Sequence, residues 1–353
     1  MKLCAPLPGH LDATKKILKE EASNLHEVFM AGSSDYIPTG RQALGESFSE
    51  TIEETTRLVH KDGLRMDVVM NASCMGGRHL TDEGLHRYMS YLEILARAGV
   101  DAVTLADPYL IEVASRNFSF DVIVSCISFV DSPEKAIFYE ELGADGITVD
   151  TSINRDFHVL EAIRDAVSCD IRVLVNEGCL YKCPFRYFDF NVVSHTSGPP
   201  PVPKISFNYY QRKCRSLRVK KPWLVMKANW VRPEDLKAYE EIGIDTFKIS
   251  GRNQPVNWVI ETIKTYKSRD FSGNLIDLLD YSRSMKHLFY IPNKKLDGAI
   301  DRWKSCDRNC HRCGFCKDLT AQIMEVYLER GTDREMLVSL TELNEGVPDE
   351  YPE

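Results

Sequence analysis

Residues 242–250 read IGIDTFKIS, and this stretch passes from the end of a helix into the start of a strand. Gly243 is expected to end the helix in the left-handed conformation. Ile244 is then expected to pack beneath the helix end, before a buried apolar run begins. The same pattern occurs at residues 98–101 and 142–145, where AGVD and LGAD also precede apolar runs. A repeated helix–Gly–x–Asp–strand unit predicts parallel strands joined by right-handed helical crossovers.

Outward from these units, short β-rich runs alternate with segments of helical periodicity. Nine runs are strand candidates: Lys2–Pro6, Glu27–Ala31, Met66–Asn71, Asp101–Ala106, Asp121–Cys126, Gly146–Asp150, Ile171–Asn176, Trp223–Ala228 and Thr246–Ser250. Four intervening segments are predicted amphipathic helices: 82–98, 133–142, 157–167 and 233–242. The alternation predicts a TIM-like (β/α) barrel, which needs eight strands, so one run is wrongly assigned or is an extra strand. An open doubly wound sheet is the alternative, weakened because no Gly-x-Gly-x-x-Gly follows a strand.

Strands and helices alternate up to about residue 270 and not beyond it, which divides the chain into two parts. Residues 1–270 are predicted to form the barrel, with a long inserted loop region at 177–222. Residues 271–353 form a C-terminal extension that contains a cysteine-rich segment at 303–318. A final helix is expected near residues 319–330.

Composition narrows the class of protein. A chain of 353 residues, 43% apolar, is long enough for one large barrel and a small extra module. The net charge of −8 argues against a general nucleic-acid binder, although a local basic patch could still contact RNA. No signal-peptide pattern or long apolar segment is visible, so a cytoplasmic protein without a membrane span is expected. The acidic, proline-containing stretch 344–353 is expected to be loose.

The densest chemical signal is a group of four cysteines within eleven residues. Four nearby basic side chains, Lys304, Arg308, Arg312 and Lys317, favour the thiolate form. Four thiolates suit a 4Fe–4S cluster or a tetrahedral zinc ion, and close spacing favours the cluster; free or disulfide-bonded thiols are the third alternative. His311 is a possible alternative ligand. The four candidate ligands are Cys306, Cys310, Cys313 and Cys316.

A second group of thiols follows a predicted barrel strand. Cys179 and Cys183 come directly after the strand that ends at Asn176, and Cys214 lies further along the insertion. Their position at the active face of a barrel favours metal ligation, although ordinary loop thiols are the alternative. The other four cysteines lie in or beside apolar runs and are interpreted as small buried hydrophobic residues: Cys4, Cys74, Cys126 and Cys169.

Several polar residues fall at predicted strand ends, where barrels place their chemistry. Asn71, Asp107, Asp150 and Glu177 are such residues, and the alternative for each is a turn or helix cap. Two cations of the last strand unit, Lys248 and Arg252, could bind an anionic group or form a salt bridge inside the barrel mouth. The candidate catalytic residues are Glu177, Lys248, Arg252 and Asp150.

Four stretches resemble the collagenase-like peptidase U32 family: 172–183, 214–215, 230–236 and 239–252. The most specific is GIDTFKISGR, which begins at Gly243; Ala5-Pro6 and 140–144 also fit, and the resemblance covers residues 1–270.

The resemblance implies a barrel with a cysteine-bound 4Fe–4S cluster. This sequence departs from the family pattern in two respects. Cys179 and Cys183 are closer together than usual, and no fourth cysteine follows soon after Cys214. The C-terminal four cysteines lie outside the common core. Either the three loop cysteines and the C-terminal four hold two clusters, which we favour, or both groups contribute ligands to one.

The family name implies a peptidase, whereas several relatives resemble oxygen-independent hydroxylation factors for ubiquinone precursors or RNA bases. No Gly-x-Ser-x-Gly or His-Glu-x-x-His occurs, which leaves a Cys183–His195 pair as the visible peptidase candidate. We therefore predict an iron–sulfur enzyme with a redox or hydroxylation role on a small molecule, a peptide or RNA. A protein partner or electron donor is possible. The alternatives are a zinc-stabilised peptidase and a non-catalytic partner with a structural cluster.

Overall fold

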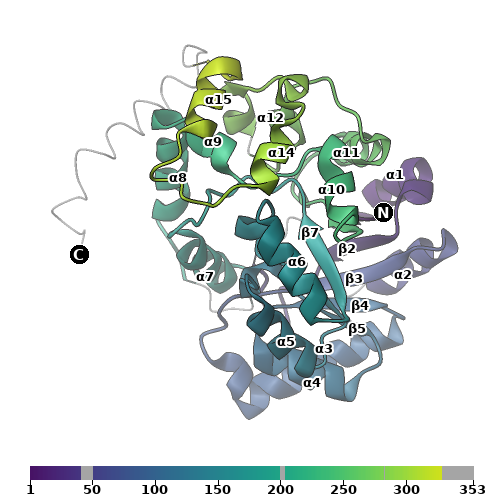
Figure 1. The fold of residues 1–353 in the computed structure, drawn as a ribbon. Helices are drawn as coiled ribbons and strands as arrows, with labels where there is room; N and C mark the ends of the chain where they lie inside the picture. Colours follow the sequence, from purple (N-terminus) through teal and green to yellow (C-terminus); the bar gives the residue numbers. More distant parts are fainter. Residues whose placement is uncertain (41–50, 199–202, 282, 328–353) are drawn as a thin grey trace.

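The computed structural model describes residues 1–40, 51–198, 203–281 and 283–327, which contain a closed barrel of eight parallel strands (Figure 1). Each strand pairs with the next along the chain, and β8 pairs back with β1. The predicted TIM-like barrel is therefore confirmed. Its strands are β1 (Lys2–Pro6), β2 (Glu27–Ala31), β3 (Arg65–Met70), β4 (Ala102–Leu105), β5 (Asp121–Val124), β6 (Gly146–Thr148), β7 (Asp170–Leu174) and β8 (Thr246–Lys248).

Helices surround the barrel and build the additional parts of the molecule (Figure 1). Those that follow β1 to β6 and β8 are α1 (Leu11–Glu21), α2 (Ile52–Lys61), α3 (Asp82–Arg97), α4 (Pro108–Asn117), α5 (Pro133–Glu141), α6 (Phe157–Ala166) and α11 (Val256–Ser268). The long connection from β7 to β8 holds α7 (Arg186–Thr196), α8 (Tyr209–Lys220), α9 (Trp223–Lys227) and α10 (Leu236–Glu240). The extension holds α12 (Leu275–Leu278), α13 (Arg283–Lys286), α14 (Ala299–Lys304) and α15 (Phe315–Ile323).

The three helix–Gly–x–Asp–strand units adopt the predicted geometry. Gly99, Gly143 and Gly243 all have positive φ, at 75°, 94° and 78°. The aspartates have a role that the pattern did not show, because two of them accept backbone N–H groups of neighbouring strands. The Asp101 carboxylate accepts from the N–H of Met66 on β3, and Asp145 accepts from the start of β5, both at 2.8 Å. Each unit thus ends a helix, and in two of the three the aspartate also fixes the start of a neighbouring strand.

One of the nine strand predictions is wrong: Trp223–Ala228 is not a strand but contains the short helix α9. Pro222 precedes it in the α conformation, and proline suits the start of a helix better than the interior of a strand. The barrel leaves no place for a ninth strand, because β7 and β8 pair directly, with Arg172 opposite Thr246. The apolar side chains of α9 pack into a second core instead.

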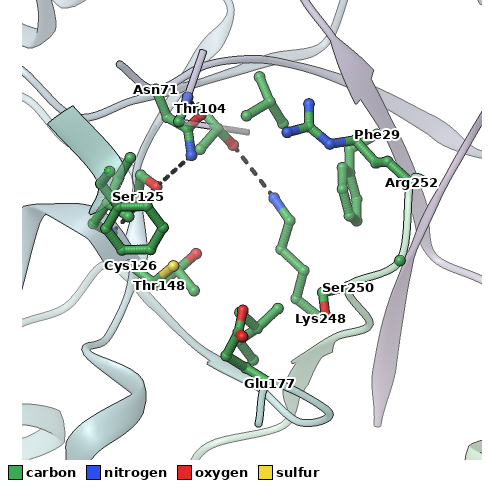
Figure 2. A pocket seen from close by; sticks show the side chains of 16 residues that line it. Phe29, Asn71, Thr104, Ser125, Cys126, Thr148, Glu177, Lys248, Ser250 and Arg252 are labelled. Carbon is green, nitrogen blue, oxygen red and sulfur yellow. Dashed lines mark hydrogen bonds between the residues drawn. The ribbon is translucent and has the colours of Figure 1, made fainter. Parts of the chain in front are cut away.

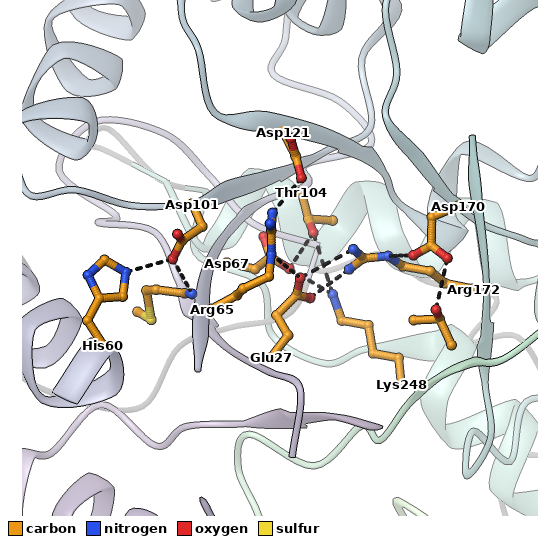
Figure 3. Close-up of polar contacts among 12 residues, drawn as sticks. Glu27, His60, Arg65, Asp67, Asp101, Thr104, Asp121, Asp170, Arg172 and Lys248 are labelled. Carbon is orange, nitrogen blue, oxygen red and sulfur yellow. Dashed lines mark hydrogen bonds and ion pairs between the residues drawn. The ribbon is translucent and has the colours of Figure 1, made fainter. Parts of the chain in front are cut away.

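Charged side chains on the first residues of several strands close the floor of the barrel (Figure 3). Arg172 bonds both carboxylate oxygens of Glu27, at 2.6 and 3.2 Å, and its Nε donates to Asp170 at 2.8 Å. Arg65 pairs with Asp121 nearby. Burial alone lowers the pKa of Arg172, but Glu27 and its other anionic neighbours outweigh that effect and raise it. This paired network makes the floor structural and leaves the opposite end for chemistry.

The C-terminal extension packs around α9 and forms the second core, separate from the barrel core. Arg155, from the loop between β6 and α6, connects the two parts. Its guanidinium lies between the rings of Trp230 and Trp303, at 3.9 and 3.7 Å, and donates to the carbonyls of Trp230 and Met226. A two-stranded ribbon of β9 (Phe289–Tyr290) and β10 (Glu325–Val326) completes the extension.

The predicted final helix begins earlier than expected, as α15, and ends at Ile323 before the ribbon strand β10. Residues 328–330 of that prediction, and the whole of 344–353, lie outside the described residues. No helix in the described part of the chain is both long enough and apolar enough to span a bilayer.

Candidate functional site at the barrel mouth

A cavity of about 80 Å³ opens at the carboxyl ends of the strands (Figure 2). Apolar side chains, including Phe29 and Phe190, form part of its wall. The polar residues that line it are Asn71, Thr104, Ser125, Thr148, Glu177, Lys248, Ser250 and Arg252, together with the thiol of Cys126. Three of the four predicted catalytic residues, Glu177, Lys248 and Arg252, therefore share one cavity.

Lys248 forms a salt bridge inside the barrel. Its Nζ lies 3.0 Å from Asp67 Oδ2 and 3.5 Å from Thr104 Oγ1, and 4.2 Å above the ring centre of Phe29. Thr104 also donates to the same carboxylate oxygen at 2.7 Å. Asp67 is fully buried, and its Oδ1 atom has no hydrogen-bond partner. Lys248 thus presents a neutralised, fixed ammonium to the cavity.

Asp150, the fourth predicted catalytic residue, positions a helix. It forms a buried ion pair with Arg186, the first residue of α7, and accepts hydrogen bonds from the N–H and Oγ of Ser152. The Arg186 guanidinium also lies above the rings of Phe129 and Phe190, at 5.1 and 5.5 Å. Asp150 therefore anchors α7 against the end of β6, where Phe190 forms part of the cavity wall.

Two of the three loop cysteines, Cys179 and Cys214, lie near Glu177, and the third, Cys183, lies near Cys214. The Cys179 thiol donates to Glu177 Oε1 at 3.4 Å. Burial raises the pKa of Cys179, with Glu177 adding to the increase and two arginines, Arg186 and Arg218, opposing it. The pKa of Cys214, on α8, is likewise raised by burial and lowered by Arg218, and the neighbouring Cys183 raises it further. The fold therefore brings Cys179, Cys183 and Cys214 into one electrostatic environment.

Arg218 is the buried cation of this environment. It donates to the carbonyl of Gly178 and lies 4.9 Å from the ring centre of Tyr281, whose hydroxyl donates to the same carbonyl at 2.9 Å. A Cβ on Gly178 would come within 2.0 Å of the Tyr281 ring, so only glycine fits. Among the described residues no carboxylate forms an ion pair with Arg218, and its Nε has no hydrogen-bond partner.

The C-terminal cysteines lie between α14 and α15, and all four are partly exposed. Arg302 approaches the Cys313 sulfur at 3.7 Å. Burial raises the pKa of Cys316, and the nearby Arg155 lowers it. Tyr181 belongs to the loop between β7 and α7, residues 175–185, which we call the mouth loop. Burial raises the pKa of Tyr181, Arg308 lowers it and Cys310 raises it, so this loop residue lies near the C-terminal group.

Across the described ranges, no three or more Cys, His, Asp or Glu side chains stand in positions that would hold a metal ion. The donor set and the surrounding charge still suit an anionic cluster, because buried Arg218 lies near Cys179 and Cys214 and, within the described ranges, forms no ion pair, although Glu177 also raises its pKa. All eleven cysteines are free thiols, so none is committed to a disulfide.

Other predicted residues lie apart from the mouth or have a local role. His195, in the last turn of α7, is about 14 Å along the helix from its start, next to Cys183, so the two do not form a pair. Asp107 caps α4 and contacts His79 at 3.2 Å. Asn71 lines the cavity and donates to Ser125 Oγ at 2.8 Å.

The four cysteines interpreted as buried hydrophobic residues divide into two pairs. Cys4 and Cys169 are buried as predicted, whereas Cys74 and Cys126 are only partly buried, and Cys126 lines the cavity. Asp67, Arg186 and Arg218 also belong to the site, and the sequence alone did not predict them. An aspartate inside the apolar run of β3 is a signal that could have identified Asp67.

Comparison with known proteins agrees with this architecture. The model of peptidase family U32 matches residues 11–270. A Methanocaldococcus jannaschii protein named "Uncharacterized protease MJ1657" is 42% identical over 318 residues, which cover 90% of this chain and 94% of that protein. The solved structure of the U32 peptidase Mk0906 superposes with a TM-score of 0.55 at 25% identity, covering 72% of this chain and 94% of that one. The chain therefore belongs to peptidase family U32.

Proposed function

We propose that this protein is an iron–sulfur enzyme of family U32, with a cluster held by Cys179, Cys183 and Cys214 beside the barrel mouth. The role we propose is a redox or oxygen-independent hydroxylation type of modification. The observation that carries the proposal is the buried guanidinium of Arg218, which forms no ion pair among the described residues and whose pKa is raised by Cys214 and Cys179 as well as by Glu177. A buried cation needs a compensating charge, and a thiolate-bound cluster is anionic.

The thiols fit this assignment chemically. Burial raises the pKa of Cys179 and Cys214, so without a metal both are held as thiols. Metal ligation requires thiolates, and Arg218 lowers the pKa of both groups. When bound, such a cluster would supply electron transfer or Lewis-acid chemistry next to the cavity.

The C-terminal group is proposed as a second centre, held by Cys306, Cys310, Cys313 and Cys316. Arg155 would have the same relation to it that Arg218 has to the first centre. Arg155 is buried, donates hydrogen bonds to the carbonyl groups of Trp230 and Met226, and lowers the pKa of Cys316. Two buried arginines, each beside one thiol group, support two centres rather than one shared centre.

The residues of the mouth would bind and orient a substrate. Lys248, fixed by Asp67, and the hydroxyl and amide groups of Ser125 and Asn71 offer polar contacts around an otherwise apolar space. Phe29 and Phe190 would exclude water from that space. Glu177 lies between the cavity and the Cys179 thiol, so it is the candidate for moving a proton at the site.

Peptide hydrolysis is the second candidate, favoured by the names of the two relatives. It has no histidine base in the mouth, because none is among the residues that line the described cavity, and Lys248 is paired with Asp67, which leaves Glu177 as the base. The Cys126 thiol in the cavity has a pKa raised by burial, which opposes its activation as a nucleophile.

A comparison of four cysteine variants tests the proposal. After purification without oxygen, Cys179→Ala should lose about four irons per chain, the content of one 4Fe–4S cluster, and so should Cys316→Ala. Cys169→Ala is the matched control. This buried thiol lies at the amino end of β7, opposite the mouth, so the variant should keep the full iron content. A Cys179→Ala protein with unchanged iron would contradict the mouth assignment. Cleavage of unstructured peptides by a Cys179→Ala protein, but not by Cys126→Ala, would favour the peptidase instead.

A further inference from the structure

A second cavity, with a volume of about 460 Å³, is larger than the mouth cavity of about 80 Å³ and shares no lining residue with it. The loop between β3 and α3, the first turns of α3 and the end of α7 bound this space, which we call the side cavity. Helix α7 contributes to both cavities, because Phe190 lines the mouth whereas Ser194 and His195 line the side cavity. The volume of the side cavity is in the range of pockets that hold small organic ligands.

Two residues that stand out in the sequence but have no role at the mouth meet at the side cavity. His195 lines it directly. Asp107 reaches it through His79, another lining residue, whose Nε2 lies 3.2 Å from Asp107 Oδ2. The other ring nitrogen of His79, Nδ1, is buried and has no hydrogen-bond partner among the described residues. Buried polar atoms are normally hydrogen-bonded, so Nδ1 is a point at which a ligand can be held.

The charged side chains around the side cavity are mostly cationic. Arg78 and Arg87 line it together with His79. Glu83 is the one carboxylate among the described lining residues, and its side chain is 86% exposed and pairs with Arg87 at 3.4 Å, so it belongs to the rim. Arg87 also donates to the carbonyl of Asp35 at 3.3 Å, which directs its guanidinium along the wall. Such a lining attracts an anion.

The deepest part of the side cavity is apolar. Ile37, Tyr88 and Leu110 line it and are each no more than 3% exposed. The hydroxyl of Tyr88 donates to the carbonyl of Leu110 at 3.0 Å, so its polar end is already satisfied. Met75 adds a flexible thioether side chain that adapts to the shape of a ligand. An apolar portion of a ligand would be stabilised by burial against these side chains.

The wall of the side cavity is formed in advance of any ligand. Thr81 accepts from the N–H of Gly84 at 3.1 Å and donates to the carbonyl of Arg78 at 2.7 Å. A Cβ on Gly84 would come within 1.8 Å of that carbonyl oxygen, so only glycine permits this turn. The same loop is joined to α7, because Ser194 Oγ accepts from the N–H of Ser73 at 3.0 Å. A preorganised wall reduces the cost of binding.

We propose that the side cavity binds a small amphiphilic anion, a molecule with an apolar chain and one carboxylate or phosphate headgroup. The headgroup pairs with Arg78 and Arg87, and Nδ1 of His79 bonds one of its oxygens. The chain lies against Met75 and Leu110. The proposal does not rest on the iron–sulfur assignment, because no cysteine is among the described residues that line the side cavity.

Isothermal titration calorimetry of the full-length protein with octanoate, octyl phosphate and octanol tests the proposal. The three probes carry the same apolar chain and differ in the headgroup. Both anions should bind with one molecule per chain, and octanol should bind at least about tenfold more weakly, because it lacks the charge-assisted hydrogen bonds. The tighter of the two anions identifies the headgroup as a carboxylate or a phosphate.

Variants locate the bound anion. Arg87→Gln and His79→Phe should each weaken anion binding about tenfold. Arg97→Gln is the matched control, because Arg97 is an exposed arginine in the last turn of the same helix, α3. Arg252→Gln, in the mouth, should bind both anions like the natural protein. Without ligand, Arg87→Gln should have the unfolding temperature of the natural protein, so that weaker binding is not due to unfolding.

Three results would overturn the proposal. Octanol binding as tightly as the anions would show that the cationic lining plays no part. Absence of binding by both anions at millimolar concentration would show that the side cavity is not a site for this class of ligand. Binding that is lost in Arg252→Gln but kept in Arg87→Gln would place the anion in the mouth instead.

Discussion

At the scale of single residues, the barrel mouth depends on buried charges that are compensated in different ways. Lys248 is neutralised directly by Asp67, and Arg186 by Asp150. Arg218 and Arg155 are buried without an ion pair among the described residues and instead face cysteine thiols. This contrast is why we assign Lys248 to substrate orientation and Arg186 to the anchoring of α7, and assign Arg218 and Arg155 a role toward anionic metal centres.

The Lys248–Asp67 pair should be important for stability. Asp67→Asn would leave a buried ammonium without its counter-charge, which costs about 3–5 kcal/mol. Urea unfolding should show this loss, whereas Asp62→Asn, at an exposed position after α2, should change the unfolding free energy by less than about 0.5 kcal/mol. Equal effects of the two substitutions would refute the pairing.

Arg218 should be needed for the mouth centre but not for the second one. Arg218→Gln removes the cation that favours thiolates at Cys179 and Cys214, so we expect about half of the iron to be lost. Arg212→Gln is the matched control, since Arg212 is an exposed cation on the same helix. Iron analysis of the two purified proteins gives the comparison, and identical iron contents would remove the observation on which the mouth centre rests.

At the scale of elements, the mouth loop is held to the C-terminal extension by Tyr281. Burial raises the pKa of Tyr281 to about 12, with Arg218 opposing. Because the pKa of Tyr281 is higher in the folded than in the unfolded chain, the protonated phenol contributes its full stabilisation below about pH 10. This contribution is lost as the pH rises toward 12.

The Tyr281→Phe variant should therefore differ from the natural protein in two ways. At pH 8 it should lose about 1 kcal/mol, because the hydrogen bond to the Gly178 carbonyl is gone. Between pH 10 and 12 its stability should fall less steeply, since one buried phenol no longer titrates. Urea unfolding at several pH values measures both effects. Tyr109→Phe, at an exposed phenol, should match the natural protein, and a parallel decline in Tyr281→Phe would contradict the argument.

Arg155 connects the barrel to the extension, and its removal should separate them. Arg155→Met leaves the carbonyls of Trp230 and Met226 without their donor and removes two cation–π contacts. We expect limited proteolysis to cut the extension, after about residue 270, well before the barrel. Arg116→Gln, at a side chain 74% exposed, should digest like the natural protein. Simultaneous digestion of the barrel and the extension in Arg155→Met would show that they unfold as one unit.

At the scale of the whole molecule, local patterns predicted the barrel well because its units are local. The glycine of each helix–Gly–x–Asp–strand unit determines its own backbone conformation, and eight of the nine predicted strand runs overlap barrel strands. The strand prediction for Trp223–Ala228 was wrong because the apolar side chains of this segment pack against residues 275–303, far away in the sequence. Periodicity over five or six residues cannot distinguish such a buried helix from a strand.

The candidate site was predictable only in part for the same reason. Glu177, Lys248 and Arg252 follow strands, so topology alone brings them to the mouth. The partners that decide their state, Asp67 and Arg218, come from the middle of a strand and from a helix of the insertion. Their roles depend on tertiary contacts that no spacing rule encodes.

The most direct test of the central claim is the metal content of the natural protein. Purified without oxygen, it should be brown and contain about eight irons and eight sulfides per chain, the content of two 4Fe–4S clusters, with little zinc. About four irons would mean that the two thiol groups share one cluster. A colourless protein with one zinc ion per chain would contradict the iron–sulfur assignment and would favour a peptidase or a structural role instead.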